Sequence, residues 1–493
     1  MKKNRFFSFI LMIGMLFSAV APAAQALDTP AVSAQAVVVL DASTGEILYE
    51  KNADERRSPA SLTKIMTGLL AVEALDRGEV SMDETVTAGL DCQTGLDQYS
   101  SNASIVAGEQ MSFRDYFYCA MVVSANEACN VLGSRIAGSI GGFVDRMNQR
   151  AEELGCANTH FSDPNGLSND NHYSSARDMS VMLLEAMRHE AFVEAFTAKE
   201  YQVPATNAND ARELKNSNAL IAKDSIYSQY GNYLYEPALG GKTGYTRQAG
   251  YCLASVAEKN GLRLLTVVMG CPGPLAETSA EPENFKDTIA LYQWAFDNFA
   301  YQQVLSTADI LAKIPVKLAD DDGTASLHCT VDVTLLLPND VPPDSRELEI
   351  RLYEDRLTAP IAAGTTLGQA VIHINGKSYG PVDLVTVSEV KMARAEFIRE
   401  QVDIFFARRE VRAVIVVLAL ILVLYFALVL RYRMLRIRHL REKRRAEQRR
   451  RAAMEQRRQT TVHEPTLRFT AMPQGEQDAD AIDLAQFFDD EKK

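Results

Sequence analysis

The chain of 493 residues is 47% hydrophobic and 23% charged, and its formal net charge is −13. This length suggests about two or three domains with sizeable cores, and the composition excludes a chain that is disordered throughout. The acidic balance gives no reason to expect a nucleic-acid partner.

The N-terminus has the pattern of a secretory signal peptide. Basic residues precede an apolar run from Phe6 to Val20, and Ala24-Gln25-Ala26 offers a cleavage site with small residues. We therefore expect residues 1–26 to be removed and the mature chain to face the outside of the cell. An N-terminal membrane anchor is the alternative, and the shortness of the run disfavours it.

A second apolar run, from Ala413 to Leu430, carries no charge and is long enough to cross a bilayer. Residues 431–458 then hold thirteen Lys and Arg against three Glu, which is typical of a cytoplasmic flank. We predict an amphipathic linker helix over 390–412, a transmembrane helix over 413–430, and a cytoplasmic tail over 431–493 that is basic at first and disordered from 459. A buried core helix is the alternative for the apolar run.

Residues 27–301 predict an α+β domain in which one antiparallel sheet is backed by a helical cluster. The expected strands are a hairpin over 36–50 and three later strands over 240–246, 251–258 and 262–270. The expected helices cover 61–75, 112–137, 143–154, 177–186 and 285–299. Short β-type runs over 302–389 predict a separate small all-β domain.

The seven cysteines are scattered and lack the spacing of metal ligands. We expect no metal site, no motif in the chain predicts a cofactor, and most thiols should be buried as small hydrophobic groups. Cys252 and Cys271 flank the last predicted hairpin, so a disulfide between them stays open as an alternative.

The segment from Ser58 to Gly68 has the pattern of a helix start, with Ser58 as the cap and Pro59 in the first turn. Ser61 and Lys64 are three residues apart, so a helix places both on one face. An amine beside a serine at the positive end of a helix can take the hydroxyl proton. A lone Ser-x-x-Lys is more often an ordinary solvated face, so its partner motifs decide the assignment.

Two such partners follow in the chain. Ser124-Ala125-Asn126 places a hydroxyl and an amide together at a turn or helix start, although helix capping alone would also explain them. Lys242-Thr243-Gly244 lies in a predicted strand whose glycines permit close approach of another backbone. Two lysines folded into one pocket should lower the pKa of one amine, as a lysine base near neutral pH requires.

The three motifs occur in this order on a predicted helix, turn and strand, a combination typical of penicillin-binding proteins and class A β-lactamases. From Ala36 to Phe299 the chain resembles the low-molecular-mass penicillin-binding proteins, the serine-type D-alanyl-D-alanine carboxypeptidases of peptidase family S11. The β-rich segment resembles that family's second domain. The resemblance implies a β-lactamase/transpeptidase-like domain, a small all-β domain and one C-terminal transmembrane helix.

The resemblance also implies how acylation would proceed. Ser61 would attack the carbonyl of the penultimate D-alanine in a peptidoglycan stem pentapeptide, with Lys64, held neutral by neighbouring cations, as its base. Ser124 would relay a proton to the leaving amine, and Asn126 would hold Lys64 and the substrate amide. β-Lactam antibiotics would acylate the same serine.

The same resemblance assigns the substrate-binding residues. Lys242, Thr243 and Gly244 would bind the terminal carboxylate of the peptide. The backbone N–H groups of Ser61 and Tyr245 would form the oxyanion hole, in which each donor contributes about 3 kcal/mol.

Two positions depart from the family pattern. Asn165 stands where the family usually carries a histidine, and Asn284 stands where it usually carries the arginine that helps to hold the substrate carboxylate. Lys286 is a candidate replacement for that arginine.

Two other functions remain as alternatives. A class A β-lactamase would need a loop glutamate to activate the deacylating water, and residues 161–176 contain none. A non-catalytic penicillin-binding or wall-sensing membrane protein is supported by the change at Asn284 and opposed by the three intact motifs.

Overall fold

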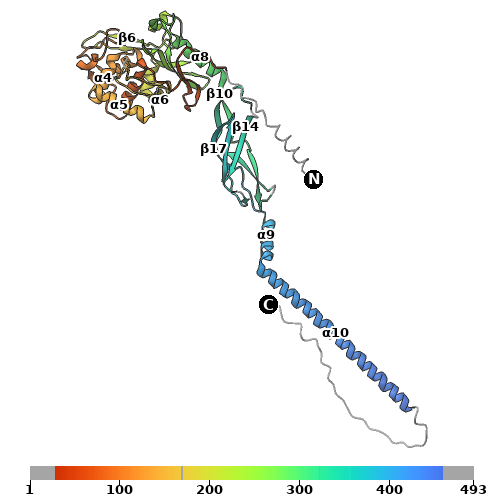
Figure 1. The fold of residues 1–493 in the computed structure, drawn as a ribbon. Coiled ribbons are helices and arrows are strands. Elements are labelled where there is room, and N and C mark those ends of the chain that lie inside the picture. Colours follow the sequence, from red (N-terminus) through yellow and green to blue (C-terminus); the bar gives the residue numbers. More distant parts are fainter. Residues whose placement is uncertain (1–27, 168–169, 321–322, 343–344, 355, 459–493) are drawn as a thin grey trace, which may run out of the picture. The chain divides into compact units, whose positions relative to one another are not determined.

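The computed structural model describes residues 28–167, 170–320, 323–342, 345–354 and 356–458 (Figure 1). The predicted signal peptide over 1–26 and the predicted disordered end from 459 lie outside the described residues. The chain forms two units, Met1–Lys391 and Met392–Lys493.

A five-stranded antiparallel sheet forms the centre of the first unit. Its strand order is β2-β1-β9-β8-β7, so the first hairpin of the chain pairs with the last long hairpin of the domain. Strands β8 and β9 are buried along most of their length, which explains their nearly continuous apolar sequences. The strands are β1 (Ala36–Asp41), β2 (Ile47–Lys51), β7 (Ala238–Thr246), β8 (Gly250–Lys259) and β9 (Leu262–Cys271).

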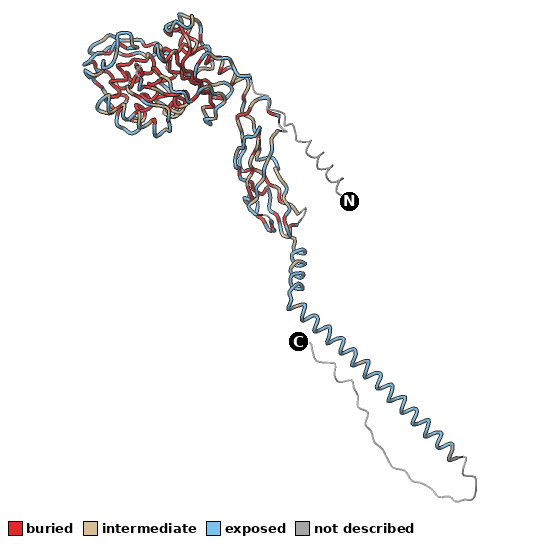
Figure 2. Tube along the Cα trace, in the orientation of Figure 1, coloured by how far each residue is buried: buried red, intermediate tan, exposed pale blue. Residues whose placement is uncertain are grey.

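Two hydrophobic cores lie on opposite faces of this sheet. Figure 2 shows that many residues of this domain are buried. Val38 and Leu40 of β1 belong to the larger core, whereas Val37 and Val39 belong to the second core, as the two-residue period of a strand requires. The larger core includes helices α2 (Lys64–Asp76), α3 (Phe113–Val122), α4 (Asn126–Ala137), α5 (Ile140–Glu153), α6 (Ala176–Ala186) and α7 (Glu190–Thr197). Helix α8 (Glu283–Asn298) packs in the second core, so the predicted α+β architecture is confirmed.

Local sequence determines where α3 begins and therefore where the next motif lies. The Ser112 hydroxyl accepts from the backbone N–H of Asp115 (3.0 Å), and the Asp115 carboxylate accepts from the Ser112 N–H (3.2 Å), which forms a capping box. The short elements of this domain are η1 (Ala60–Thr63), β3 (Thr85–Thr87), η2 (Leu90–Gln93), β4 (Gln110–Ser112), β5 (Glu200–Val203), β6 (Arg212–Lys215), η3 (Ile226–Gln229) and η4 (Pro274–Ala276).

Cys252 and Cys271 are both free thiols, so the alternative of a disulfide between them is wrong. Cys252 faces the larger core, and Cys271 faces the second core. Side chains on opposite faces of one sheet point apart, and their sulfur atoms cannot come within bonding distance without backbone movement.

Within the described part of residues 299–391, strands form a two-stranded sheet of β10 and β13 and a six-stranded sheet in the order β14-β16-β17-β12-β11-β15. The all-β character predicted for this segment is confirmed. Strand β10 runs across the predicted boundary at residue 302, and the exact domain limits stay a prediction. The strands are β10 (Phe299–Leu305), β11 (Ala312–Lys317), β12 (Thr324–Cys329), β13 (Val333–Pro338), β14 (Arg346–Leu352), β15 (Leu357–Thr358), β16 (Thr366–Ile374) and β17 (Lys377–Thr386).

The second unit consists of two helices, α9 (Arg394–Ala407) and α10 (Arg409–Arg458), over its described residues. Helix α10 is long and apolar enough to cross a membrane, by length and composition. It contains the predicted span over 413–430 and continues through the basic segment, so the start of the predicted tail is helical as far as Arg458.

We expect every thiol of the chain to be free. Maleimide labelling of the denatured protein should modify all seven cysteines whether or not a reductant is added first, because Cys252 and Cys271 lie on opposite faces of the sheet. Intact-mass spectrometry measures the number of labels, and a gain of two labels on reduction would contradict the structure. In the control variant Cys271→Ser, the number should fall by one.

Candidate active site

Ser61 lies in η1, a single turn of 3₁₀-helix that leads directly into α2. The prediction that Ser58 caps this helix is wrong: Pro59 occupies the N-cap position, and no side chain makes a cap hydrogen bond. The reason is the backbone of Ala60, whose φ of 48° is left-handed and interrupts a regular first turn. The serine is thus presented by a strained turn at the end of a buried helix, an arrangement found at functional sites.

The Lys64 amine meets three oxygen atoms. Its Nζ lies 2.9 Å from Ser61 Oγ, 2.7 Å from Asn126 Oδ1 and 2.7 Å from the carbonyl oxygen of Asn165. A neutral amine has two N–H groups and one lone pair. The amide and carbonyl oxygens accept the two N–H groups, which leaves the lone pair for the hydroxyl proton of Ser61.

Burial favours that neutral form. The Lys64 side chain has no exposed surface, and burial lowers its pKa, whereas Cys129, Asp163 and Glu127 oppose the shift. The prediction that neighbouring cations hold Lys64 neutral is therefore wrong in its cause. Loss of hydration disfavours the charged amine here, and the nearby acidic groups act in the opposite direction.

Lys242 lies in β7 and is also buried, with its Nζ donating to the carbonyl oxygen of Thr243 (3.2 Å). Burial lowers the pKa of Lys242 well below its ordinary value, and the nearby amine of Lys64 adds to this lowering, because two charged amines would repel each other. The fold therefore brings the two predicted lysines into electrostatic contact from positions 178 residues apart (242 − 64).

Ser124 lies in the short connection between α3 and α4, as predicted. Its φ of 63° is left-handed, and its side-chain oxygen is buried without a hydrogen-bond partner among the described residues. A buried hydroxyl without a partner carries a desolvation penalty, which a bound ligand would relieve. Ala125 then serves as the N-cap position of α4, and Asn126 is its first residue.

Strand β7 is an edge strand of the sheet, and it packs on η1. A Cβ atom on Gly244 would lie 3.0 Å from the carbonyl oxygen of Pro59 and 3.2 Å from the backbone nitrogen of Ser61. The glycine therefore allows the strand to approach the serine closely. The neighbouring Thr243 hydroxyl is hydrogen-bonded to Ser217 Oγ (2.7 Å).

A cavity of about 250 Å³ opens between these elements. Its lining includes six of the eight predicted residues, namely Ser61, Ser124, Asn126, Thr243, Gly244 and Tyr245. Lys64 and Lys242 are buried and are not part of the lining. Sequence reasoning missed Ser217 and the loop residues Tyr99, Ser100 and Ser101, which also line the cavity and belong to no motif.

The two departures from the family pattern have different consequences. Asn165 contributes its backbone carbonyl to Lys64, a contact that any residue could make. Asn284 is buried and donates to the carbonyl oxygen of Cys252 (3.2 Å). The idea that Lys286 replaces the missing arginine is wrong: it does not line the cavity, and its Nζ pairs with Glu281 (2.9 Å).

A serine hydroxyl, a buried lysine amine and a second hydroxyl lie around one cavity, an arrangement typical of serine–lysine acyl transfer. Residues 23–273 match the peptidase S11 family, described as D-alanyl-D-alanine carboxypeptidase, and residues 299–392 match the C-terminal domain of penicillin-binding protein 5. The chain belongs to the peptidase S11 family of D-alanyl-D-alanine carboxypeptidases.

Relatives with known names cover most of the chain. It is 31% identical over 389 residues to D-alanyl-D-alanine carboxypeptidase DacF of Bacillus subtilis, a match that covers 78% of this chain and 94% of that protein. It is 31% identical over 367 residues to D-alanyl-D-alanine carboxypeptidase DacA of Escherichia coli K12, with 73% and 84% covered. The crystal structure of penicillin-binding protein 5 from Haemophilus influenzae aligns with a TM-score of 0.56 at 29% identity, over 74% of this chain and 99% of that one. The family, the fold class and the D-alanyl-D-alanine carboxypeptidase function predicted from the sequence are confirmed, and the individual residue roles stay predictions.

Gly166→Ala should destabilise the turn that presents Ser61. Gly166 has a φ of 90°, and an added Cβ would lie 1.9 Å from the carbonyl oxygen of Ala60, so the backbone beside the serine has to move. We expect a loss of about 2 to 3 kcal/mol in the free energy of unfolding, measured by chemical denaturation, together with slower acylation by a fluorescent penicillin.

Gly155→Ala is the matched control for this variant. Gly155 has a φ of 75° and no atom within 4 Å of the added Cβ, so it reports the strain of a left-handed residue alone, about 1 kcal/mol. Equal losses of stability and equal acylation rates in the two variants would contradict the close contact with Ala60.

The rate of acylation should depend on pH through Lys64. Because burial lowers the pKa of this amine, it is neutral and able to accept the serine proton at pH values below the ordinary range of lysine. Acylation should therefore rise with pH to a plateau, with its inflection below the pKa of free lysine. Stopped-flow measurement with a chromogenic β-lactam gives the profile. Lys64→Arg should acylate slowly at every pH, and an inflection near the ordinary lysine value would contradict a neutral base.

Proposed function

We propose that this protein removes the terminal D-alanine from peptidoglycan stem pentapeptides by serine-type catalysis, through an acyl-enzyme on Ser61. The observation that carries the proposal is the 2.9 Å contact between Lys64 Nζ and Ser61 Oγ at the edge of a cavity. A serine in contact with a buried amine has a proton acceptor that needs no reorganisation.

Acylation begins when the lone pair of Lys64 takes the hydroxyl proton of Ser61. The serine oxygen attacks the carbonyl carbon of the penultimate D-alanine, and the carbonyl electrons move onto its oxygen. The backbone N–H groups of Ser61 and Tyr245 are the proposed donors to this oxyanion. Both residues line the cavity, which supports the assignment.

The leaving group departs when the tetrahedral intermediate collapses and the bond to the terminal D-alanine nitrogen breaks. Ser124 relays the proton from Lys64 to that nitrogen, a role supported by its hydroxyl, which has no hydrogen-bond partner among the described residues. Asn126 holds Lys64 in place through the 2.7 Å hydrogen bond. Water then attacks the ester and releases the shortened peptide.

The terminal carboxylate of the substrate is assigned to Thr243, Gly244 and the buried Lys242. An anion bound beside Lys242 favours the charged form of this amine and so offsets the effect of burial. A β-lactam would bind in the same way, because its carboxylate takes the place of the terminal carboxylate of the peptide and its strained amide takes the place of the peptide bond that Ser61 attacks. When the β-lactam ring opens, the leaving amine remains covalently linked to the acyl group and cannot diffuse away, so that acylation inhibits the enzyme.

We assign the catalytic domain to the outer side of the cell membrane, with α10 as the single anchor. The apolar composition of residues 413–430 and the basic residues that follow support this orientation. The stem peptides would then be reached from the bilayer surface, and the basic end of α10 would lie in the cytoplasm.

Release of free D-alanine from a stem pentapeptide tests the function directly. We expect the wild-type protein to release one equivalent and leave a tetrapeptide, and Ser61→Ala to lower the rate on the order of 10,000-fold. Ser58→Ala removes a nearby serine outside the cavity and should keep wild-type activity. Mass spectrometry of the protein with a penicillin should show one adduct in the wild type and none in Ser61→Ala. Turnover that survives in Ser61→Ala would refute the assignment.

A further inference from the structure

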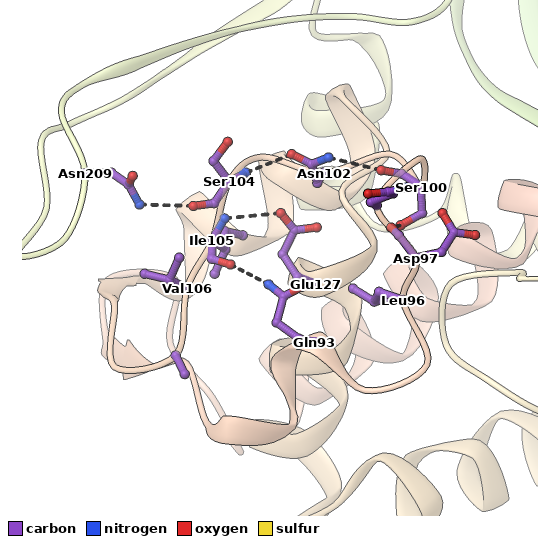
Figure 3. A pocket seen from close by; sticks show the side chains of 12 residues that line it. Gln93, Leu96, Asp97, Ser100, Asn102, Ser104, Ile105, Val106, Glu127 and Asn209 are labelled. Atoms are coloured by element: carbon purple, nitrogen blue, oxygen red, sulfur yellow. Dashed lines mark hydrogen bonds between the residues drawn. The ribbon is translucent and has the colours of Figure 1, made fainter.

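A second cavity lies next to the one that contains Ser61. Its volume is about 480 Å³, it is lined mainly by the loop over 93–107, and Ser100 lines both cavities (Figure 3). The two are also joined through α4, because Asn126 lines the first cavity and the following residue, Glu127, lines the second. A group in the second cavity would therefore lie beside a substrate held at Ser61.

Glu127 is a buried carboxylate that lines this cavity, and the proposed mechanism does not use it. Its side chain is only 1% exposed, and its Oε1 accepts from the backbone N–H groups of Ala103 (2.6 Å) and Ile105 (3.2 Å). Its Oε2 is buried and has no hydrogen-bond partner among the described residues. Figure 3 shows the carboxylate facing the cavity between Ser104 and Ser100. A buried carboxylate oxygen without a partner is costly unless a ligand satisfies it.

The charges of the lining residues favour a positively charged ligand. Asp97 and Glu127 are acidic, and none of the described lining residues is Lys, Arg or His. Burial raises the pKa of the Glu127 carboxyl, so a bound cation would restore its charged form. Two side-chain amides of the lining already donate to backbone carbonyls of the loop: Gln93 donates to the Ile105 carbonyl (2.7 Å), and Asn209 donates to that of Ser104 (3.1 Å).

An ammonium group suits this site better than a metal ion. Within the described residues, no three His, Cys, Asp or Glu side chains are placed to hold a metal. Calcium takes six to eight oxygen ligands, whereas a primary ammonium is satisfied by one carboxylate and two further acceptors. The hydroxyl oxygens of Ser100 and Ser104 in the same lining can supply such acceptors.

We propose that this cavity is a subsite for a positively charged amine on the substrate peptide, which Glu127 binds through Oε2 with Asp97 at its rim. The inference rests on the proposed function, because the amine belongs to the peptide that Ser61 cleaves. The subsite would make the enzyme specific for peptides with a free side-chain amine. Peptides whose amine is already acylated, as in a crosslink, would lose the contact with Glu127 and bind less well.

Two matched peptides test the subsite. Nα-acetyl-L-lysyl-D-alanyl-D-alanine carries a free ε-amine, and its Nα,Nε-diacetyl form carries none. With the full-length protein in detergent, D-alanine release should give a kcat/KM about tenfold higher for the free amine, mostly through KM, as one charge-assisted hydrogen bond implies. In Glu127→Gln, which keeps an oxygen for the N–H groups of Ala103 and Ile105, the ratio of the two kcat/KM values should fall to about one.

Asp97→Asn and Glu152→Gln complete the design. Asp97 lies on the exposed rim and its Oδ1 accepts from the Tyr99 N–H (2.7 Å), which asparagine can preserve, so Asp97→Asn should fold and should lower the ratio in part. Glu152 is an exposed carboxylate on α5, outside the cavity, and Glu152→Gln should keep the wild-type ratio.

The outcomes separate the two hypotheses. Equal kcat/KM for the two peptides in the wild type would overturn the subsite and leave the carboxypeptidase assignment intact, as would a wild-type ratio in folded Glu127→Gln. If Glu127→Gln fails to fold, an unchanged ratio in Asp97→Asn overturns the subsite. Failure of the wild type to release D-alanine from either peptide would overturn the proposed function and the subsite together.

Discussion

The buried amine of Lys64 is the group on which the rest of the site depends. Its nitrogen atom contacts three separate segments of the chain: the turn at Ser61, Asn126 at the start of α4, and the loop at Asn165. The side chain has no contact with solvent, so its neutral form is favoured before any substrate arrives. The larger core around α2 therefore affects chemistry as well as stability. It excludes the water that would otherwise stabilise the charged amine, and so lowers the pKa of Lys64.

Close backbone packing supplies the second constraint. Gly244 on β7 and Gly166 in the loop over 161–175 both approach the turn that holds Ser61, from different parts of the chain. Neither position has room for a Cβ atom without movement of that turn. The left-handed backbones of Ala60 and Ser124 lie in the same region, and the surrounding contacts hold them there. Strain and tight packing are thus concentrated around Ser61 and Ser124, which both line the first cavity.

In the two proposals, the two cavities bind opposite charges of one peptide. The carboxylate end is assigned to Thr243, Gly244 and the buried Lys242, and an amine further back is assigned to Glu127 in the second cavity. Asn126 and Glu127 are adjacent in α4, so one helix start supports both.

Much of this organisation was accessible from the sequence because it is local or strictly ordered along the chain. Short segments carry the patterns of the three motifs, of the strands of the sheet and of the apolar run in α10. The structure has helices and strands at the positions that these patterns predict. Ser124 was expected at a turn, and the capping box at Ser112 followed by a helix of ten residues leads to that turn.

The features that only the tertiary structure decided all depend on distant segments meeting. Cys252 and Cys271 look like neighbours on a hairpin, yet the alternation of the strands sends them to opposite cores. The lowered pKa of Lys64 comes from burial, which no local pattern indicates, and its partner at Asn165 is a backbone carbonyl that has no sequence signature. Glu127 Oε2 is likewise buried, without a hydrogen-bond partner among the described residues, because the loop over 93–107 folds over α4. Sequence specifies residue types and their order, whereas hydration, contact and the cause of a pKa shift are decided when the folded chain excludes water.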